Sequence, residues 1–216
     1  MMRLIHAFRS IPERNKIIVY GRLNMIKGLF YFIFKIVVGI VFNSSLLIAM
    51  ALYNLCIDLV KVNCSRGLKK NTDDLKDCNS YITGGIVIAV SSICYASYAV
   101  IQLFNPSNTK YHMIVGIIIA LFATYSIVMS IIGVVKTRGK TMLIKEYRLA
   151  NFAGAFTNIV LAQIAILSFT TEANMASYNA LVSGIVGVFI FAIGIYLIVH
   201  GILMKRVYTT GITNAK

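Results

Sequence analysis

The sequence predicts an all-α integral membrane protein, a six-helix bundle with both termini in the cytoplasm. Of its 216 residues 58% are hydrophobic and only 13% are charged, about half the charged share of a soluble domain. The apolar residues form long blocks, and the basic residues gather in the segments between them. This composition excludes a soluble enzyme, a disordered regulator and, with only four scattered cysteines, a secreted disulfide scaffold.

Apolar blocks of helical length define the spans. The blocks cover residues 27–62, 81–104, 112–135, 150–169 and 178–204. A hydrocarbon core about 30 Å thick needs about 20 apolar residues per helix, which fits every block except the first. That first block is too long for one tilted crossing, and Asn43-Ser44-Ser45 is the only polar cluster near its middle.

The distribution of lysine and arginine decides that the first block is a hairpin. Basic residues gather in segments 1–27, 61–80, 136–149 and 205–216, whereas the other connections carry only Lys110. A turn at Asn43-Ser44 places all four basic segments on one side of the membrane, as the positive-inside rule requires of cytoplasmic segments. The formal charge of +14 is therefore explained by membrane topology, and no nucleic-acid partner is expected.

The chain divides into three parts in order. Residues 1–24 are predicted to be a basic amphipathic segment on the inner leaflet, because apolar residues recur there at helical spacing up to Pro12. The alternative is a frayed cytoplasmic tail, and the segment does not resemble a secretory signal. Residues 25–204 form the transmembrane domain, and residues 205–216 form a cytoplasmic tail. The predicted helices span residues 25–42, 45–62, 81–104, 112–135, 150–170 and 178–204.

Three ionisable residues lie inside the predicted spans: Lys35, Asp58 and His200. Such residues cost about 2.5–3.5 kcal/mol at the bilayer centre, so they are candidates for function. Lys35 and Asp58 differ in depth by about 10 Å, so a direct ion pair would need the full length of the lysine. Asp58 could instead pair with Lys61 or with water, and His200 lies near the headgroup level beside Lys205.

A polar seam is expected between the second, third and fifth predicted helices. Asn54 precedes Asp58 by four residues and so shares its helix face. The fifth helix supplies Asn151, Thr157, Asn158 and Gln163, and the third supplies Ser91, Ser92, Tyr95, Ser97, Tyr98 and Gln102. The seam is either a translocation path or a set of ordinary interhelical hydrogen bonds. Small residues four apart mark a close-packing face on the sixth helix, which is either a dimer face or an internal contact. These pairs are Ala180-Gly184 and Ser183-Gly187.

Cys64 and Cys78 flank the basic connection between the second and third helices. No disulfide is expected there, because thiols are kept reduced in the cytoplasm. A zinc site on these two cysteines would need two further ligands, which only Asp73, Asp74 and Asp77 could supply.

The first hairpin, FIFKIVVGIVFNSSLLIAMALYNLCID, resembles the first two helices of the cation diffusion facilitator family of divalent-metal exporters. The resembling residues are Lys35, Gly39, Ser44 or Ser45, Leu47, Ala51, Asn54, Leu55 and Asp58. The order of six helices matches, as does an aromatic third helix that ends in Leu103-Phe104-Asn105-Pro106. The resemblance implies a metal site between the second and fifth helices, coupled to proton exchange.

The sequence departs from this family at the metal ligands. The ligand positions on the second helix fall on Tyr53 and Ile57 or, with a one-residue shift, on Asn54 and Asp58. On the fifth helix the counterparts are Gly154 and Asn158, and residues 149–169 contain no Asp, Glu, His or Cys. The metal candidates are therefore only Asn54, Asp58 and Asn158. The family's C-terminal metal-binding domain has no counterpart in the last dozen residues, so neither a tight zinc site nor a bound cofactor is expected.

The sequence favours a transporter-like protein of the plasma membrane. A small cation or solute would pass along the seam of Lys35, Asn54, Asp58 and Asn158, with the lipid bilayer as the surrounding partner. The alternative is a non-transporting interaction, regulatory or immunity protein on the same or an unrelated six-helix fold. A homodimer is left open. An enzyme is not expected, because no loop or span gathers a nucleophile, a base and an orienting group.

Overall fold

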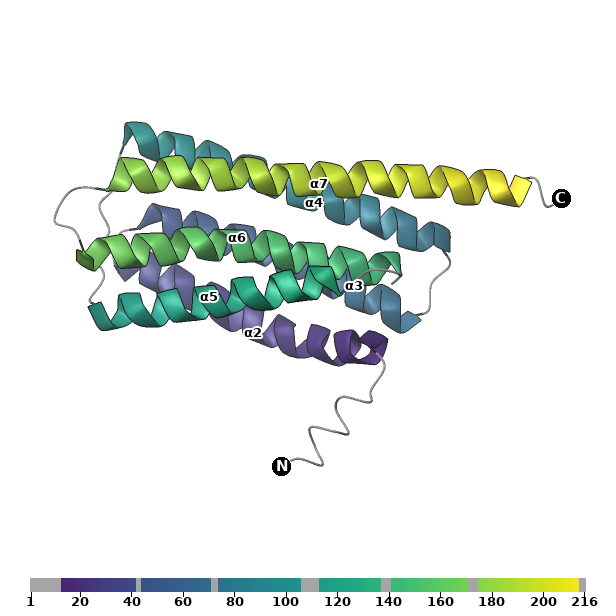
Figure 1. The fold of residues 1–216 in the computed structure, drawn as a ribbon, viewed down its shortest axis with the longest axis horizontal. Coiled ribbons are helices and arrows are strands. Elements are labelled where there is room, and N and C mark those ends of the chain that lie inside the picture. The colour runs from purple at the N-terminus through teal and green to yellow at the C-terminus, as the bar shows by residue number, and fades with distance from the viewer. Residues whose placement is uncertain are drawn as a thin grey trace, which may run out of the picture.

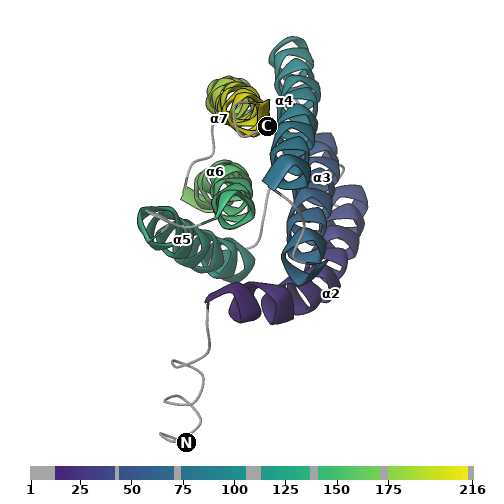
Figure 2. The same cartoon turned by 90° about the vertical axis from the view of Figure 1, so that its right-hand side faces the viewer.

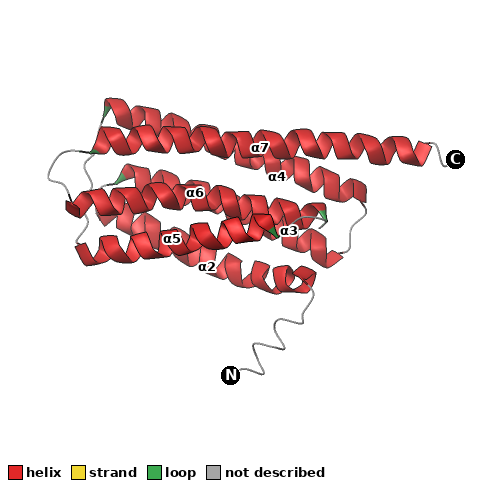
Figure 3. Cartoon of the chain, in the orientation of Figure 1, coloured by secondary structure: helices red, strands yellow, loops and turns green. Residues whose placement is uncertain are grey.

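Every regular element in the described part of the chain is an α-helix (Figures 1 and 3). The structure, a computed structural model, describes residues 13–41, 44–70, 74–105, 113–136, 141–170 and 175–213. The helices are α2 (Glu13–Val41), α3 (Ser45–Lys70), α4 (Asp74–Phe104), α5 (Met113–Val135), α6 (Met142–Thr170) and α7 (Ala176–Thr213). The all-α class and the six-helix count predicted from the sequence are thus confirmed. Of the predicted segment 1–24, residues 1–12 lie outside the described residues. Residues 13–24 form the first part of α2.

The predicted hairpin is present, because α2 ends at Val41 and α3 begins at Ser45. The Ser44 amide donates a hydrogen bond of 2.7 Å to the Gly39 carbonyl and so closes the end of α2. Asn43 lies outside the described residues. Helices α3 to α7 are long and apolar enough to cross a membrane, whereas the apolar part of α2 covers only Gly28–Val41. That stretch is about 20 Å long, so a complete crossing by α2 stays a prediction.

Successive helices alternate in direction, so α2 begins and α7 ends at the same end of the bundle (Figure 1). Helices α3 and α5 also end there, and α4 and α6 begin there. We call it the basic end, because it carries the basic segments 61–80 and 136–149. The side of the membrane that the basic end faces stays a prediction.

The helices form two layers (Figure 2). One layer contains α2, α3 and α4, and the other contains α5, α6 and α7. The layers meet most extensively where α4 packs against α7, and α3 packs against α6 near the centre. The described parts of α2 and α5 form no comparable contact. The packed core therefore belongs to α3, α4, α6 and α7, and α2 and α5 lie at its periphery.

The helices extend beyond the predicted boundaries at the basic end. Helix α2 begins at Glu13 and α7 ends at Thr213, and α6 begins at Met142 although the sequence predicts a loop over residues 136–149. Leu143, Ile144 and Tyr147 are buried there and belong to the hydrophobic core. The prediction was wrong because bilayer thickness limits the apolar run of a span but does not end the helix, which continues as long as one face stays packed.

The α4–α7 contact depends on glycines seven apart on α7, which lie against residues seven apart on α4. A Cβ at Gly187, Gly194 or Gly201 would lie 2.7–2.9 Å from atoms of Ala96, Ala89 or Ile82. The partners on α4 decrease by seven as those on α7 increase by seven, as expected for antiparallel helices that keep one register. A seven-residue repeat favours left-handed supercoiling, and small side chains let the two backbones approach closely.

The close-packing face predicted on the sixth helix is in part an internal contact. Gly187 lies against Ala96, and Ala180 and Ser183 are fully buried. A Cβ at Gly184 would meet no atom within 4 Å, so this glycine makes no close approach within the described part of the chain.

We predict opposite effects for two glycine substitutions in α7. Gly194→Ala should lower the stability by about 1–3 kcal/mol, because the new methyl group would meet the Ala89 backbone, which cannot move aside. Gly184→Ala, the matched control, should be neutral or should stabilise by about 0.5–1 kcal/mol, because alanine restricts the unfolded chain and meets nothing. Thermal unfolding of the purified protein in detergent compares the two variants. Equal melting temperatures would contradict the assigned α4–α7 register.

Candidate functional site

Asp58 lies between α2 and α3 and forms an ion pair within its own helix. Its Oδ1 accepts a hydrogen bond of 2.8 Å from Lys61 Nζ, and both side chains are partly exposed. On the opposite side the carboxyl rests on Gly28 of α2, where any Cβ would collide with it. Of the alternatives that the sequence leaves for Asp58, the structure shows the pair with Lys61.

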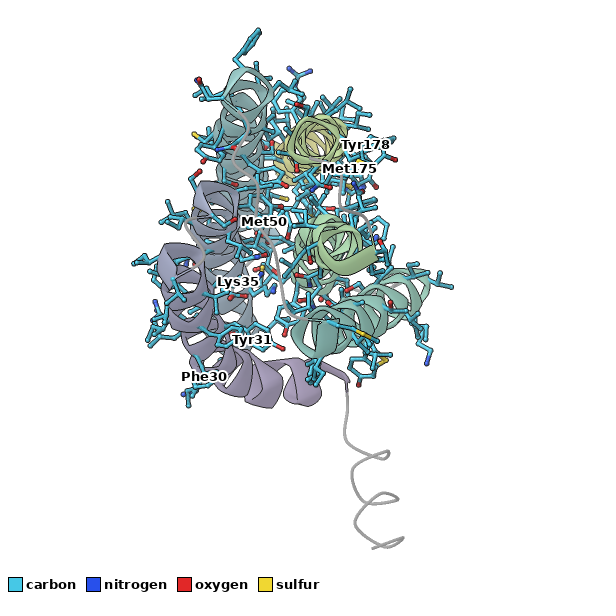
Figure 4. The ribbon with its side chains drawn as sticks, turned by 90° about the vertical axis from the view of Figure 1, so that its left-hand side faces the viewer. Phe30, Tyr31, Lys35, Met50, Met175 and Tyr178 are labelled. Carbon is cyan, nitrogen blue, oxygen red and sulfur yellow. The ribbon has the colours of Figure 1, made fainter. Side chains whose placement is uncertain are left out.

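Lys35 is buried, with 7% of its surface exposed. It points with Tyr31 from α2 toward the interior between the two layers, whereas Phe30 points outward (Figure 4). Asp58 is the acid whose charge acts on the Lys35 ammonium, without a direct ion pair between the two. The described cluster therefore holds two ammonium groups and one carboxylate, Lys35, Lys61 and Asp58, with a formal charge of +1.

Asn54 lies one turn from Asp58, at the contact between α3 and α6. The Thr157 hydroxyl donates to the Gly154 carbonyl over 2.8 Å and lies 3.3 Å from Asn54 Oδ1, and Gly154 leaves room for the amide beside Ile57. The Asn54 Nδ2 group is buried and has no hydrogen-bond partner among the described residues. This part of the site thus offers a free N–H donor in an otherwise apolar interface, which is rare in protein interiors.

The polar residues of α6 do not all face the seam that the sequence predicts. Asn158 Nδ2 donates to Ser126 Oγ of α5 over 3.1 Å. It follows Thr157 by one residue, which turns it by about 100° around the helix and away from α3. Gln163 bonds to Asn179 of α7 in the same way. Lys35, Asn54 and Asp58 are therefore brought to one region, and Asn158 is corrected to the α5–α6 contact.

Two buried tyrosines lie on the side of Asn54 that is further from the basic end of the bundle. Tyr53 and Tyr95 are buried with ring centroids 5.7 Å apart. The Tyr53 hydroxyl has no partner among the described side chains, and the Tyr95 hydroxyl faces Ser183 of α7. Beyond them the Gln102 amide donates to Ser45 Oγ and to Tyr98 Oη, both over 2.7 Å. Polar atoms thus occur at several depths along the α3–α4 contact.

His200 does not join this group. Its ring lies against Tyr81 and Tyr196, with centroid distances of 5.6 Å and 5.7 Å. It belongs to the α4–α7 contact near the basic end. Its expected level at the headgroups stays a prediction. Cys64 and Cys78, which the sequence predicts to flank a loop, are free and buried inside α3 and α4.

The sequence does not reveal the part that Gly28 plays, nor the buried Glu146 of α6. Gly28 resembles any helical glycine, and only the structure brings it against Asp58. Glu146 is hidden in the sequence by the neighbouring Lys145 and Arg148, which suggest a loop. The apolar spacing of Leu143 and Tyr147 was a usable signal for a packed helix face.

The described residues contain no group of three or more His, Cys, Asp or Glu side chains that could hold a metal ion. Asn54 and Asp58 alone would give one carboxylate and one amide, whereas structural zinc takes four N, O or S ligands. Comparison of the chain with known protein families, curated proteins and solved structures gave no match. The function must therefore be inferred from the geometry of the chain itself.

A double-mutant cycle tests whether Asp58 compensates the buried charge of Lys35. Asp58→Asn should destabilise the protein, because the Lys35 ammonium loses the acid that acts on it. Adding Lys35→Met should restore part of that loss, with a coupling of about 0.5–3 kcal/mol between the two sites. Unfolding free energies in detergent give the coupling.

The matched control is Lys69→Met, an exposed lysine near the end of α3. Its effect should add to that of Asp58→Asn without coupling. Strict additivity of Lys35→Met and Asp58→Asn would contradict a shared charge cluster.

Proposed function

We propose that the chain is a small transporter-like membrane protein that passes a small cation or small polar solute between its two helix layers. The observation that carries the proposal is the cluster of Lys35, Asp58 and Lys61, followed one turn deeper by the Asn54 Nδ2 group, which has no partner among the described residues. Ionisable groups inside spans are costly, and they most often mark substrate or proton pathways.

The formal charge of the cluster determines how a cation could bind. Since two lysines surround one aspartate, a cation gains access to Asp58 only by displacing the Lys61 ammonium from it. The Lys61 and Asp58 side chains are 16% and 22% exposed, so this exchange can take place from the basic end. Asn54 and the hydroxyls of Tyr53 and Tyr95 would then offer the solute neutral polar contacts at greater depth.

The contact of α3 with α6 supports a likeness to cation efflux proteins, because the resemblance places the transported ion between these two helices. The ligands differ, since the counterpart positions on α6 are Gly154 and Asn158, of which Gly154 has no side chain and Asn158 bonds to Ser126 of α5. We therefore propose a weakly coordinated or monovalent ion, or a small organic solute, in place of zinc.

A second candidate is a membrane protein that acts by binding another one. It is favoured by α5, which packs on α6 and exposes most of its apolar side chains. Lipid alone can cover such a surface, so this feature supports the second candidate less than the buried charges support the first.

Transport by reconstituted vesicles tests the leading proposal. Asp58→Asn should lower the initial rate of uptake or efflux of the transported species by about tenfold or more, equivalent to about 1.4 kcal/mol of lost interaction. The panel should contain alkali cations, divalent cations and small organic cations. Asp74→Asn removes an exposed carboxylate at the same end and should leave the rate unchanged. Unchanged rates in Asp58→Asn across a panel that the parent protein transports would exclude the role of Asp58.

We also propose that the basic end faces the cytoplasm of a cell whose plasma membrane holds the protein, as the positive-inside rule predicts. An epitope tag after Lys216 should then bind antibody only in permeabilised cells. A tag inserted between α4 and α5 should bind antibody in intact cells. The reverse pattern would invert the topology.

A further inference from the structure

Glu146 is a fully buried acid that the proposed transport site does not use. It lies in the second turn of α6, with none of its surface exposed. Its neighbours Leu143, Tyr147 and Ala150 belong to the hydrophobic core. A carboxyl group in such a position needs a chemical explanation, because buried acids are normally paired with a cation or bound to a metal.

Gly84 of α4 provides the space that the carboxyl occupies. A Cβ at this position would collide with Glu146 Oε1, and it would also lie 3.1 Å from Val60 of α3. The next residue, Gly85, faces α7 instead. The acid is therefore held in a closed site formed by α3, α4 and α6.

The groups around the carboxyl are neutral donors or acids. Ser80 Oγ donates to Glu146 Oε2 over 3.4 Å, and the Cys64 thiol of α3, a weak donor, lies against the same carboxyl. Asp77 and Tyr81 of α4 interact with it electrostatically, and the His200 ring of α7 lies against the Tyr81 ring. Glu146 Oε1 accepts no N–H or O–H hydrogen bond within the described residues.

No described lysine, arginine or histidine forms an ion pair with Glu146. Lys205 at the same end donates to Asn79 instead. The N–H groups at the start of α6 that lack a partner within the helix belong to the turn before Glu146, because the helix begins at Met142. They therefore do not bind its carboxyl. An ionised carboxylate would thus lack both a counter-ion and a full set of donors in an apolar interior.

We propose that Glu146 is a proton-binding site in which the carboxyl is held as a neutral acid. The proton neutralises the negative charge of the carboxylate, which no described residue of the chain compensates. It is also the one cation that needs no additional space beside Gly84. Loss of the proton would create an isolated charge, which a buried site resists.

A hydrogen-bonded route connects this site with the surface. Asn63, which is exposed, donates from Nδ2 to Ser80 Oγ over 3.1 Å, and Ser80 in turn donates to Glu146. Ser80, which is itself partly exposed, therefore connects the surface near the basic end with the buried acid. A hydroxyl in the middle of such a chain both accepts and donates, so it can relay a proton.

This site is separate from the cluster at Asp58. Asp58 rests on Gly28 of α2, whereas Cys64, six residues further along α3, faces Glu146. The inference therefore does not require that the chain transports anything.

Infrared spectroscopy of the full-length protein in lipid bilayers tests the proposal. A protonated carboxyl gives a C=O stretch above the amide I band, and deuteration lowers its frequency. We expect this band at neutral pH, and we expect carbon-13 labelling of glutamate, but not of aspartate, to shift it. Glu146→Gln, which keeps the shape of the side chain, should remove the band. Asp58→Asn and Asp74→Asn should retain it.

If Glu146→Gln does not fold, the proposal can still be tested with labelled protein that keeps Glu146. Glu13→Gln with Glu172→Gln leaves Glu146 as the only glutamate, and the glutamate band should persist in that protein. Absence of the band from the parent protein at neutral pH, or its survival in folded Glu146→Gln, would overturn the proton-binding site.

Exchange of the band with deuterium tests the route. Ser80→Ala should slow the exchange severalfold, because the hydroxyl between Asn63 and Glu146 is removed. Thr83→Ala, an exposed hydroxyl on the same helix, should leave the exchange rate unchanged. Equal rates in the Ser80→Ala and parent proteins would overturn the route.

Discussion

The close approach of α4 and α7 is the contact on which the rest of the bundle depends. Glycine and alanine seven residues apart remove the side chains that would separate these helices, and Gly85 meets the Gly194 backbone directly. This contact joins the two layers along one edge and so brings α3 against α6. Gly84, one residue earlier, faces the other way and receives Glu146. Two consecutive glycines thus serve both the helix contact and the buried acid.

The structure separates its charged groups by helix face. On α3, Asp58 rests against α2 and pairs with Lys61, Asn54 faces α6, and Ile57 and Cys64 belong to the core. The polar side chains of α6 are divided among three neighbours: Thr157 faces α3, Asn158 faces α5 and Gln163 faces α7. A single polar seam is therefore replaced by a charged cluster at the periphery and a neutral acid site in the core.

Much of the fold follows from sequence, because bilayer thickness fixes the length of an apolar run. The hairpin was predictable from Asn43 to Ser45 and from the distribution of basic residues, and α3 begins where expected. The site was only partly predictable. Asp58 and Lys35 are conspicuous as ionisable residues in apolar runs, but the side to which Asn158 turns depends on how α6 rotates against its neighbours. Glu146 was missed because the adjacent basic residues suggest a loop at a position where the helix has a buried face. Burial depends on how the helices pack, and composition does not show this packing.

Disulfide cross-linking in native membranes tests the α4–α7 register most directly. Cysteines placed at Ala96 and Gly187 should form a disulfide within one chain, since these positions bring Cβ atoms into contact. Cys94 should be replaced by serine in this protein, because it is exposed nearby. After cleavage at a protease site inserted between α5 and α6, the two halves should stay joined until a reductant is added. Halves that separate without reductant would contradict the register and the arrangement of layers built on it.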